Sequence, residues 1–132
     1  MSDDPTDARA PARTTVEFPA RDGYRGVATL VLGGVAARFE LPVDRVDDLL
    51  LGVDSLLMQG VVGEVARVEA TASESELTVR VGAFRRGQLD DAAVRRVVAR
   101  LVDTVQEVPA DGGEGAWIEL GIRVARRGGA SP

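Results

Sequence analysis

Four residue types are missing from this chain of 132 residues: histidine, cysteine, lysine and asparagine. These residues supply many of the nucleophiles, neutral-pH general bases, soft metal ligands and phosphate-binding ammonium groups of enzymes. Their absence excludes disulfide bonds, metal sites made of cysteine and histidine, and catalytic sites built on any of the four. Asp, Glu, Arg, Ser, Thr and a single tyrosine, Tyr24, remain for chemistry.

The composition predicts one soluble globular domain with one core, since 45% of the residues are hydrophobic and the length is ordinary for a domain. The net charge of −5 disfavours nucleic acid or an anionic membrane as a partner. No apolar run approaches the ~20 residues of a membrane span. The N-terminus, MSDDPTDARAPAR, is acidic and unlike a signal peptide, so we expect a cytoplasmic protein.

The two ends of the chain lack apolar periodicity. We expect residues 1–13, rich in Asp, Pro and Ala, to form a disordered tail and residues 127–132 to fray. The folded domain is predicted to span residues 14–126.

Between these ends, hydrophobic periodicity predicts strand, helix, helix, strand, strand, helix, strand, strand. The expected ranges are 14–18, 22–39, 44–60, 65–71, 76–81, 89–102, 104–108 and 116–124. The later strands alternate apolar and polar residues, which indicates a sheet with one buried face. The predicted fold is a two-layer α/β sandwich, mostly antiparallel, with three helices on one face.

Each predicted helix has an inward stripe. In the first helix, with Asp22 as its cap, the stripe contains Tyr24, Val27, Ala28, Val31, Val35 and Phe39. In the second, the inward stripe contains Val46, Leu49, Leu50, Val53, Leu56 and Leu57. Its opposite face carries a small, mildly polar strip of four residues: Asp48, Gly52, Ser55 and Gln59. In the third, Val94, Val97, Val98 and Leu101 face inward and the arginines face outward.

Three sequence strings in this order resemble the anti-sigma regulatory factors, which are small bacterial serine kinases of the histidine-kinase-like (Bergerat-type) ATPase superfamily. Residues 41–59, LPVDRVDDLLLGVDSLLMQ, follow the family's second helix, usually LP and then DDLRLAVDEACTN. ELTVRV is similar to the strand before the family's adenine-binding box. VVARLVDTVQEV and DGGEGAWIEL are similar to its closing helix, strand and hairpin. The resemblance covers about residues 14–126 and implies the ATPase fold.

The residues that carry the family's chemistry are replaced here. Ser55 stands where the family has its catalytic Glu, and Gln59 stands where an Asn coordinates magnesium. Ala83 replaces the Asp that binds adenine, and Arg85 replaces a Gly of that box. The resemblance therefore implies a vestigial nucleotide groove at Asp48, Gly52, Ser55, Gln59, Ala83 and Arg85, with no catalytic residue, no metal site and no bound cofactor.

Other features leave two interpretations open. The polar strip of the second predicted helix is either this old groove or docking surface, or a helix face covered by the loop 82–88. Gly33 and Gly34 mark a close contact across a dimer or internal packing. Trp117 and Phe84 are interface anchors or ordinary packing, and DGGEG at 111–115 is a cation loop or a turn. One cluster of arginines either binds an acidic partner or forms a solvated surface: Arg85, Arg86, Arg95, Arg96 and Arg100.

The resulting hypothesis is a degenerate anti-sigma regulator that acts by protein binding. The implied partners are a sigma factor or an anti-sigma antagonist, through Arg85, Arg95, Arg96 and Arg100, and the resemblance also implies a homodimer. One alternative is an active kinase that uses ATP and magnesium, with Gln59 as metal ligand and Asp54 or Asp48 as base. A further alternative is a self-associating structural domain.

Overall fold

The elements follow the predicted order in the computed structural model, which describes residues 12–110, 112 and 115–124. The elements are β1 (Ala12–Pro19), a 3₁₀ turn η2 (Asp22–Tyr24), α1 (Arg25–Arg38), α2 (Val43–Leu57), β2 (Val65–Ala72), β3 (Glu76–Arg85), α3 (Ala93–Leu101), β4 (Thr104–Pro109) and β5 (Gly115–Arg123).

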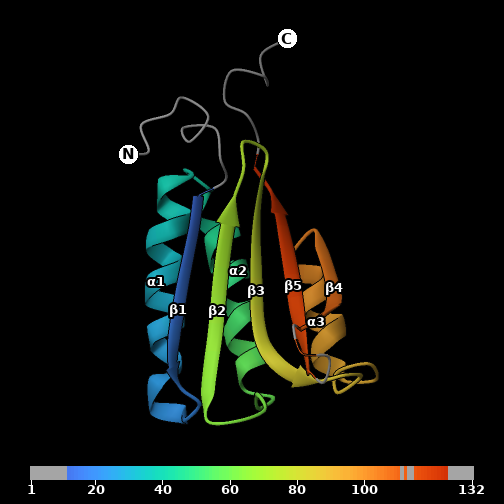
Figure 1. Ribbon diagram of the computed structural model, residues 1–132. Coiled ribbons are helices and arrows are strands. Elements are labelled where there is room, and N and C mark those ends of the chain that lie inside the picture. Colours follow the sequence, from blue (N-terminus) through green and yellow to red (C-terminus); the bar gives the residue numbers. More distant parts are fainter. Residues whose placement is uncertain (1–11, 111, 113–114, 125–132) are drawn as a thin grey trace.

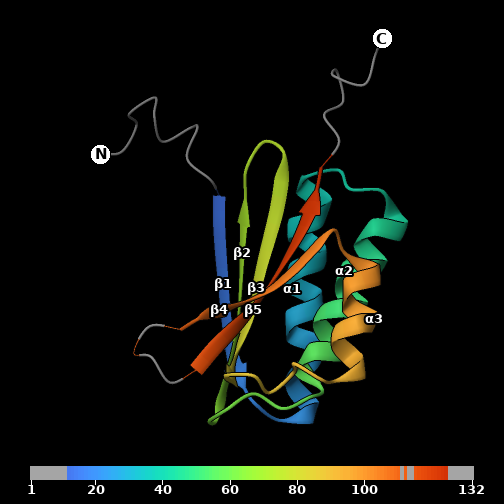
Figure 2. The same ribbon diagram turned by 90° about the vertical axis from the view of Figure 1, so that its right-hand side faces the viewer.

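The five strands form one sheet in the order β1-β2-β3-β5-β4, and every neighbouring pair is antiparallel (Figure 1). The three helices lie together on one face of this sheet (Figure 2). The predicted two-layer sandwich is therefore confirmed.

The core lies between the sheet and the helices because each central strand alternates. In β2, Ala66, Val68, Ala70 and Ala72 are buried, while the residues between them face the other side. Val79, Leu120 and Leu49 are among the fully buried side chains, contributed by β3, β5 and α2. The opposite face of the sheet is polar, and no helix of the described residues lies on it, as the alternation predicts.

The N-terminal strand is longer than predicted. Its backbone pairs with β2 from Ala12 and Arg13 onward, opposite Ala72 and Thr71, so the ordered domain begins before residue 14. Pairing with a neighbouring strand extends a strand through residues that lack apolar periodicity of their own. The rest of the predicted tail, 1–11, and the predicted frayed end, 127–132, lie outside the described residues.

The inward stripe of α1 differs from the prediction. The buried line is Ala28, Leu32 and Ala36, whereas Tyr24 is 42% and Val27 36% exposed. Between its terminal arginines α1 carries no charged residue, so periodicity alone could not decide which apolar side turns inward. The helix packs against α2 and the first strands, and this packing chooses the buried line.

The beginnings of the helices also differ. Asp22 lies in η2 and makes no side-chain bond to the helix backbone; its carboxylate instead faces the Arg25 guanidinium at 3.5 Å. The second helix begins after Pro42, one residue earlier than predicted, so Asp44 lies within its first turn. The third helix is shorter than predicted, because residues 86–91 form turns before it.

Within the described part of the chain, no helix is both long enough and apolar enough to cross a bilayer.

Candidate functional site

The polar strip formed by Asp48, Gly52, Ser55 and Gln59 is called the α2 strip from here on. Its middle is covered by α3. Gly52 is buried, and a Cβ atom at this position would lie 3.7 Å from Cγ1 of Val98 and 4.0 Å from Cδ1 of Leu101. A third neighbour, Cδ1 of Leu120 in β5, would lie 3.9 Å away. Glycine at position 52 therefore lets α3 approach α2, and side chains fill the space beside it.

Two polar members of the strip, Ser55 and Gln59, bond to the backbone of α2. The Ser55 hydroxyl donates to the Leu51 carbonyl at 2.7 Å, and Nε2 of Gln59 donates to the Ser55 carbonyl at 3.3 Å. Such bonds to the residue four positions earlier are common for short polar side chains in helices. Asp48 lies half-buried one turn before Gly52.

The loop after β3 is fastened to the end of α2 by Gln88. Its Oε1 accepts from the Arg85 backbone N–H at 2.9 Å. Its Nε2 donates to the carbonyls of Gln59 and Gly60, at 3.3 and 3.0 Å. These contacts favour a covered helix face as the interpretation of the strip. Sequence reasoning did not identify Gln88, although it is the one uncharged polar side chain in a loop of arginines and aspartates.

The positions carried over from the family do not offer the family's chemistry. Ala83 has no polar side chain, and its carbonyl accepts from the Val62 N–H at 2.7 Å, while Arg85 is exposed at the end of β3. Gln59, the substitute for the magnesium-binding Asn, lies just beyond the end of α2, and its side-chain amide bonds back to the Ser55 carbonyl. These residues do not fit an adenine nucleotide with its magnesium ion.

Asp54, a candidate base under the kinase alternative, is used elsewhere. Its Oδ1 accepts from Nε of Arg25 at 2.7 Å, across the contact between α2 and α1. This hydrogen bond and the charge of Asp54 raise the pKa of Arg25 above its ordinary value. The carboxylate therefore faces α1 rather than the α2 strip.

The arginine cluster is only partly assembled. Arg96 and Arg100 are exposed one turn apart on α3, whereas Nη1 of Arg95 pairs with the Asp90 carboxylate at 3.3 Å. Arg85 and Arg86 are exposed at the other end of the intervening loop. Of the predicted partner-binding residues, Arg96 and Arg100 share one exposed surface of α3, with Val97, which is 49% exposed, beside them.

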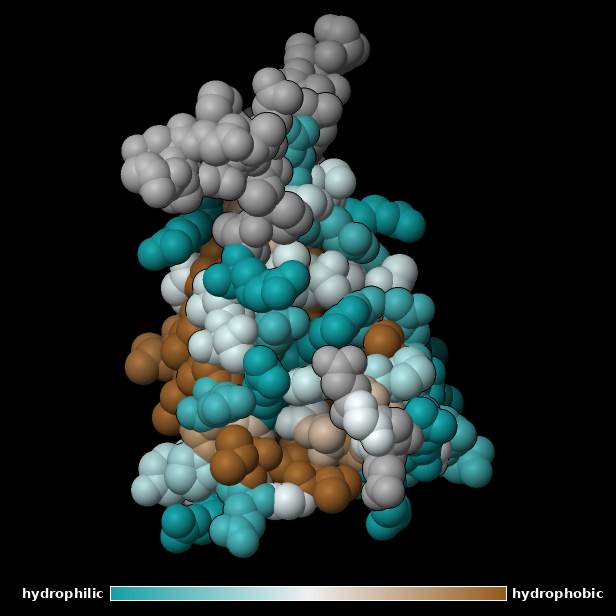
Figure 3. Space-filling model, viewed as in Figure 1, coloured by the Kyte–Doolittle hydropathy of each residue, from teal (hydrophilic) through white to brown (hydrophobic). Residues whose placement is uncertain are grey.

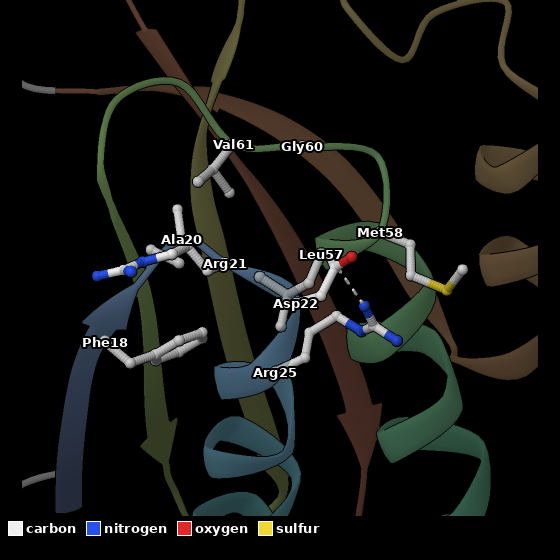
Figure 4. Close-up of a pocket in the computed structure, with 10 residues that line it drawn as sticks. Phe18, Ala20, Arg21, Asp22, Arg25, Leu57, Met58, Gly60 and Val61 are labelled. Carbon is white, nitrogen blue, oxygen red and sulfur yellow. Dashed lines mark hydrogen bonds and ion pairs between the residues drawn. The ribbon is translucent and has the colours of Figure 1, made fainter.

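A small pit lies where α1 begins, with a volume of about 120 Å³ (Figure 4). Phe18 and Leu57 contribute apolar walls, and the Arg25 side chain lies toward Asp22 at its rim. The volume is below the ~300–1,000 Å³ of typical ligand pockets.

The polar face of the sheet holds a second depression, and its charges are largely paired. Nε of Arg80 donates to Glu119 at 2.8 Å, and Gln106 donates to the same carboxylate at 2.6 Å. Burial tends to raise the pKa of Glu119, but these two hydrogen bonds and the charge of Arg80 outweigh it and hold the pKa below its ordinary value. The lining residues are Arg13, Arg67, Glu69, Thr71, Thr78, Arg80, Trp117 and Glu119.

The two candidate aromatic anchors have different positions. Phe84 is buried in the core, which confirms ordinary packing. Trp117 lies on the polar face across Gly82, and the Arg67 guanidinium stands 5.7 Å from its ring centroid. The side chain is therefore half-buried by its own chain.

The surroundings of Gly33 and Gly34 bear on whether this pair serves internal packing or a contact across a dimer. A Cβ at Gly33 or Gly34 would meet nothing within 4 Å, so close internal packing does not explain this pair. In the segment DGGEG, Gly112 has a φ of +91°, which is typical of a turn; residues 111, 113 and 114 lie outside the described residues.

No family model matches this sequence, and a search of curated proteins finds no match either.

Proposed function

We propose that this protein is a regulatory protein of the anti-sigma type that acts by binding other proteins, with ATP binding and kinase activity lost. The observation that carries the proposal is the closed α2 strip. Val98 and Leu101 fill the space beside Gly52, and Gln88 fastens the loop over the end of the helix. A chain that resembles a nucleotide-binding family but fills the nucleotide's place retains the scaffold for protein contacts.

The proposed partners are a sigma factor or an anti-sigma antagonist, as the resemblance implies. Support comes from Arg96 and Arg100, which are exposed on one side of α3. Two guanidinium groups one turn apart can form bidentate bonds to carboxylates of an acidic partner segment.

Isothermal titration with ATP and magnesium tests the loss of nucleotide binding. We expect no heat of binding. Micromolar affinity would overturn this half of the proposal, and transfer of labelled phosphate to an antagonist, abolished by Gln59→Ala, would restore the kinase alternative.

Affinity capture from a lysate of the native cell tests the partner. The native protein is compared with a double variant, Arg96→Glu and Arg100→Glu, and with Arg38→Glu, an exposed arginine on α1. We expect a sigma factor or its antagonist to be captured by the native protein and by Arg38→Glu, but not by the double variant. Recovery of no transcription regulator at any salt concentration would count against the proposal.

Self-association is a second candidate function, favoured by the outward face of α1. Leu30 on this face is 79% exposed, and Gly34, one turn later, leaves open space beside the helix. A protruding leucine and a glycine gap on one helix are suited to packing against a second copy, which is the homodimer that the resemblance implies. Sedimentation should then show a dimer that Leu30→Arg dissociates and that Leu51→Arg, at a residue 54% exposed on α2, leaves intact.

A further inference from the structure

The outer edge of β1 is open. β1 is the first strand in the sheet order, and no strand among the described residues pairs with its outer side. Edge strands of this kind present unpaired N–H and C=O groups to other chains. At the end of β1, the Ala20 N–H donates to the Glu64 carbonyl at 2.9 Å, in line with the β1–β2 register.

This bond shows which backbone groups are available. Hydrogen-bonded positions alternate along an antiparallel pair. Counting back from Ala20, the even-numbered residues of β1 bond to β2, so Arg13, Thr15 and Glu17 turn their backbone groups to the open side. Pro19 fits this pattern, because a residue without an N–H is tolerated where the ladder does not need one.

An apolar stripe of α1 accompanies this edge. Tyr24, Val27, Val31 and Val35 are exposed or half-buried and follow one another at three- and four-residue steps. Helical geometry places them on one side of the buried line, while Arg25 on the other side bonds to Asp54 of α2. The stripe therefore faces away from α2, toward the open side of β1.

The figures agree with this arrangement. α1 lies along β1 and extends past the edge of the sheet (Figure 1). Hydrophobic side chains gather along the same side of the molecule in Figure 3. An added strand beside β1 would lie beneath α1 and cover the stripe.

We propose that the open edge of β1 and the apolar stripe of α1 form a docking site for an extended segment of a partner protein, which adds a strand to the sheet. Backbone bonds to Arg13, Thr15 and Glu17 supply affinity, and alternate side chains supply specificity. This inference rests on the proposed function in one respect, that the chain acts through protein contacts.

The charges of β1 specify the segment. On the polar face, Arg13 and Glu17 stand on either side of Thr15. A complementary strand carries an acidic residue opposite Arg13 and a basic residue opposite Glu17, since opposite charges directly across a sheet stabilise it and like charges destabilise it. Its intervening residues are apolar and face the stripe.

A second copy of this chain does not fit the site. If the β1 strands of two copies paired antiparallel about a two-fold axis at Thr15, Arg13 of each copy would lie opposite Glu17 of the other, which is a favourable pairing of charges. However, because α1 lies over β1 and extends past it, such a pair would bring the two copies of α1 into the same space. A single extended segment without a helix layer avoids this collision.

Two synthetic peptides of identical composition test the proposal, VKVTVEV and VEVTVKV. In either strand direction, one of them places opposite charges against Arg13 and Glu17 and the other places like charges. By fluorescence anisotropy with labelled peptides, the native protein should prefer one peptide by about fivefold or more. The variant with both Arg13→Glu and Glu17→Arg should reverse this preference.

A second variant, Thr15→Pro, removes a backbone donor of the open edge. It leaves the backbone bonds to β2 in place and removes one exposed side-chain bond, from the Thr15 hydroxyl to Glu69 at 3.4 Å. We expect it to lose affinity for both peptides while its thermal unfolding midpoint stays close to that of the native protein. Binding of both peptides with equal affinity, an unchanged order in the exchanged variant, or no binding at millimolar peptide would overturn the inference.

The sedimentation of Thr15→Pro checks the occupant. If the native protein is a dimer and Thr15→Pro converts it to a monomer, a second copy occupies the edge and the inference fails. The proposed function is judged separately, because capture of a transcription regulator through Arg96 and Arg100 does not involve β1.

Discussion

Arg25 and Asp54 join the first turn of α1 to the last turns of α2 through a 2.7 Å hydrogen bond between Nε and Oδ1. The two residues lie at the rim of the helix layer, and the contact leaves the other side of α1 turned toward the β1 edge. The same contact turns the Asp54 carboxylate toward α1 and away from the α2 strip.

This pair should be coupled in stability. We expect Arg25→Gln and Asp54→Asn each to lower the urea midpoint, and the double variant to lower it by less than the sum, because each single change already removes the bond. Urea unfolding of all four proteins measures the coupling. Additive effects would show that the pair contributes nothing to stability in solution.

Gly52 should tolerate one added methyl group but not a large side chain. Gly52→Ala places a Cβ at ordinary contact distance, 3.7 Å from Val98, and adds helix propensity, so we expect the free energy of unfolding to rise by up to about 1 kcal/mol. Gly52→Leu is too large for the contact with α3 and should lower the free energy of unfolding by about 1–3 kcal/mol. Gly33→Ala, where nothing lies within 4 Å, is the control and should only stabilise. Equal effects of Gly52→Ala and Gly52→Leu would contradict the close approach of α3 to Gly52.

Gly82 should be required beneath Trp117. A Cβ at Gly82 would lie 3.0 Å from Cε3 of Trp117 and 3.2 Å from the Ala116 carbonyl oxygen. We expect Gly82→Ala to lower the free energy of unfolding by about 1–3 kcal/mol and to shift Trp117 fluorescence to longer wavelength as the ring is displaced. Thr78→Ala, on the same face of β3, controls for nonspecific effects and should leave the emission unchanged.

Glu119 should make stability depend on acid pH. The pKa of Glu119 is held below its ordinary value in the folded protein. Its contribution to the free energy of unfolding is therefore fully present above the unfolded-state pKa of about 4.3, and it is lost as the pH falls through the lower folded-state pKa. We therefore expect the free energy of unfolding of the native protein to exceed that of Glu119→Gln by about 1 kcal/mol near pH 6. This difference in unfolding free energy should narrow below pH ~4.

Urea unfolding from pH 3 to pH 7 measures this difference. Glu69→Gln is the control, since Glu69 lies on the same face and accepts a hydrogen bond from Thr15 at 3.4 Å. A constant difference between the native protein and Glu119→Gln across this range would show that Arg80 and Gln106 do not hold the proton off Glu119.

The candidate site was predicted less well than the fold. The spacing put Asp48, Gly52 and Ser55 on one side of α2, whereas Gln59 lies beyond the end of that helix at Leu57. Periodicity could not tell that Val98 and Leu101 would cover Gly52, because that contact joins helices distant in the chain. Gln88 was missed for the same reason: its partners, Gln59 and Gly60, come from another element.

The sequence by itself determined the order of strands and helices and the buried face of the sheet. Alternation in β2, β3 and β5 is a local property, since neighbouring side chains of a strand point to opposite sides whatever the strand pairs with. Only the tertiary structure decided which side of α1 is buried, because that helix is apolar all around and burial depends on where α2 and the sheet lie. The same packing left the Tyr24–Val35 stripe beside an open strand edge, which no local pattern specifies.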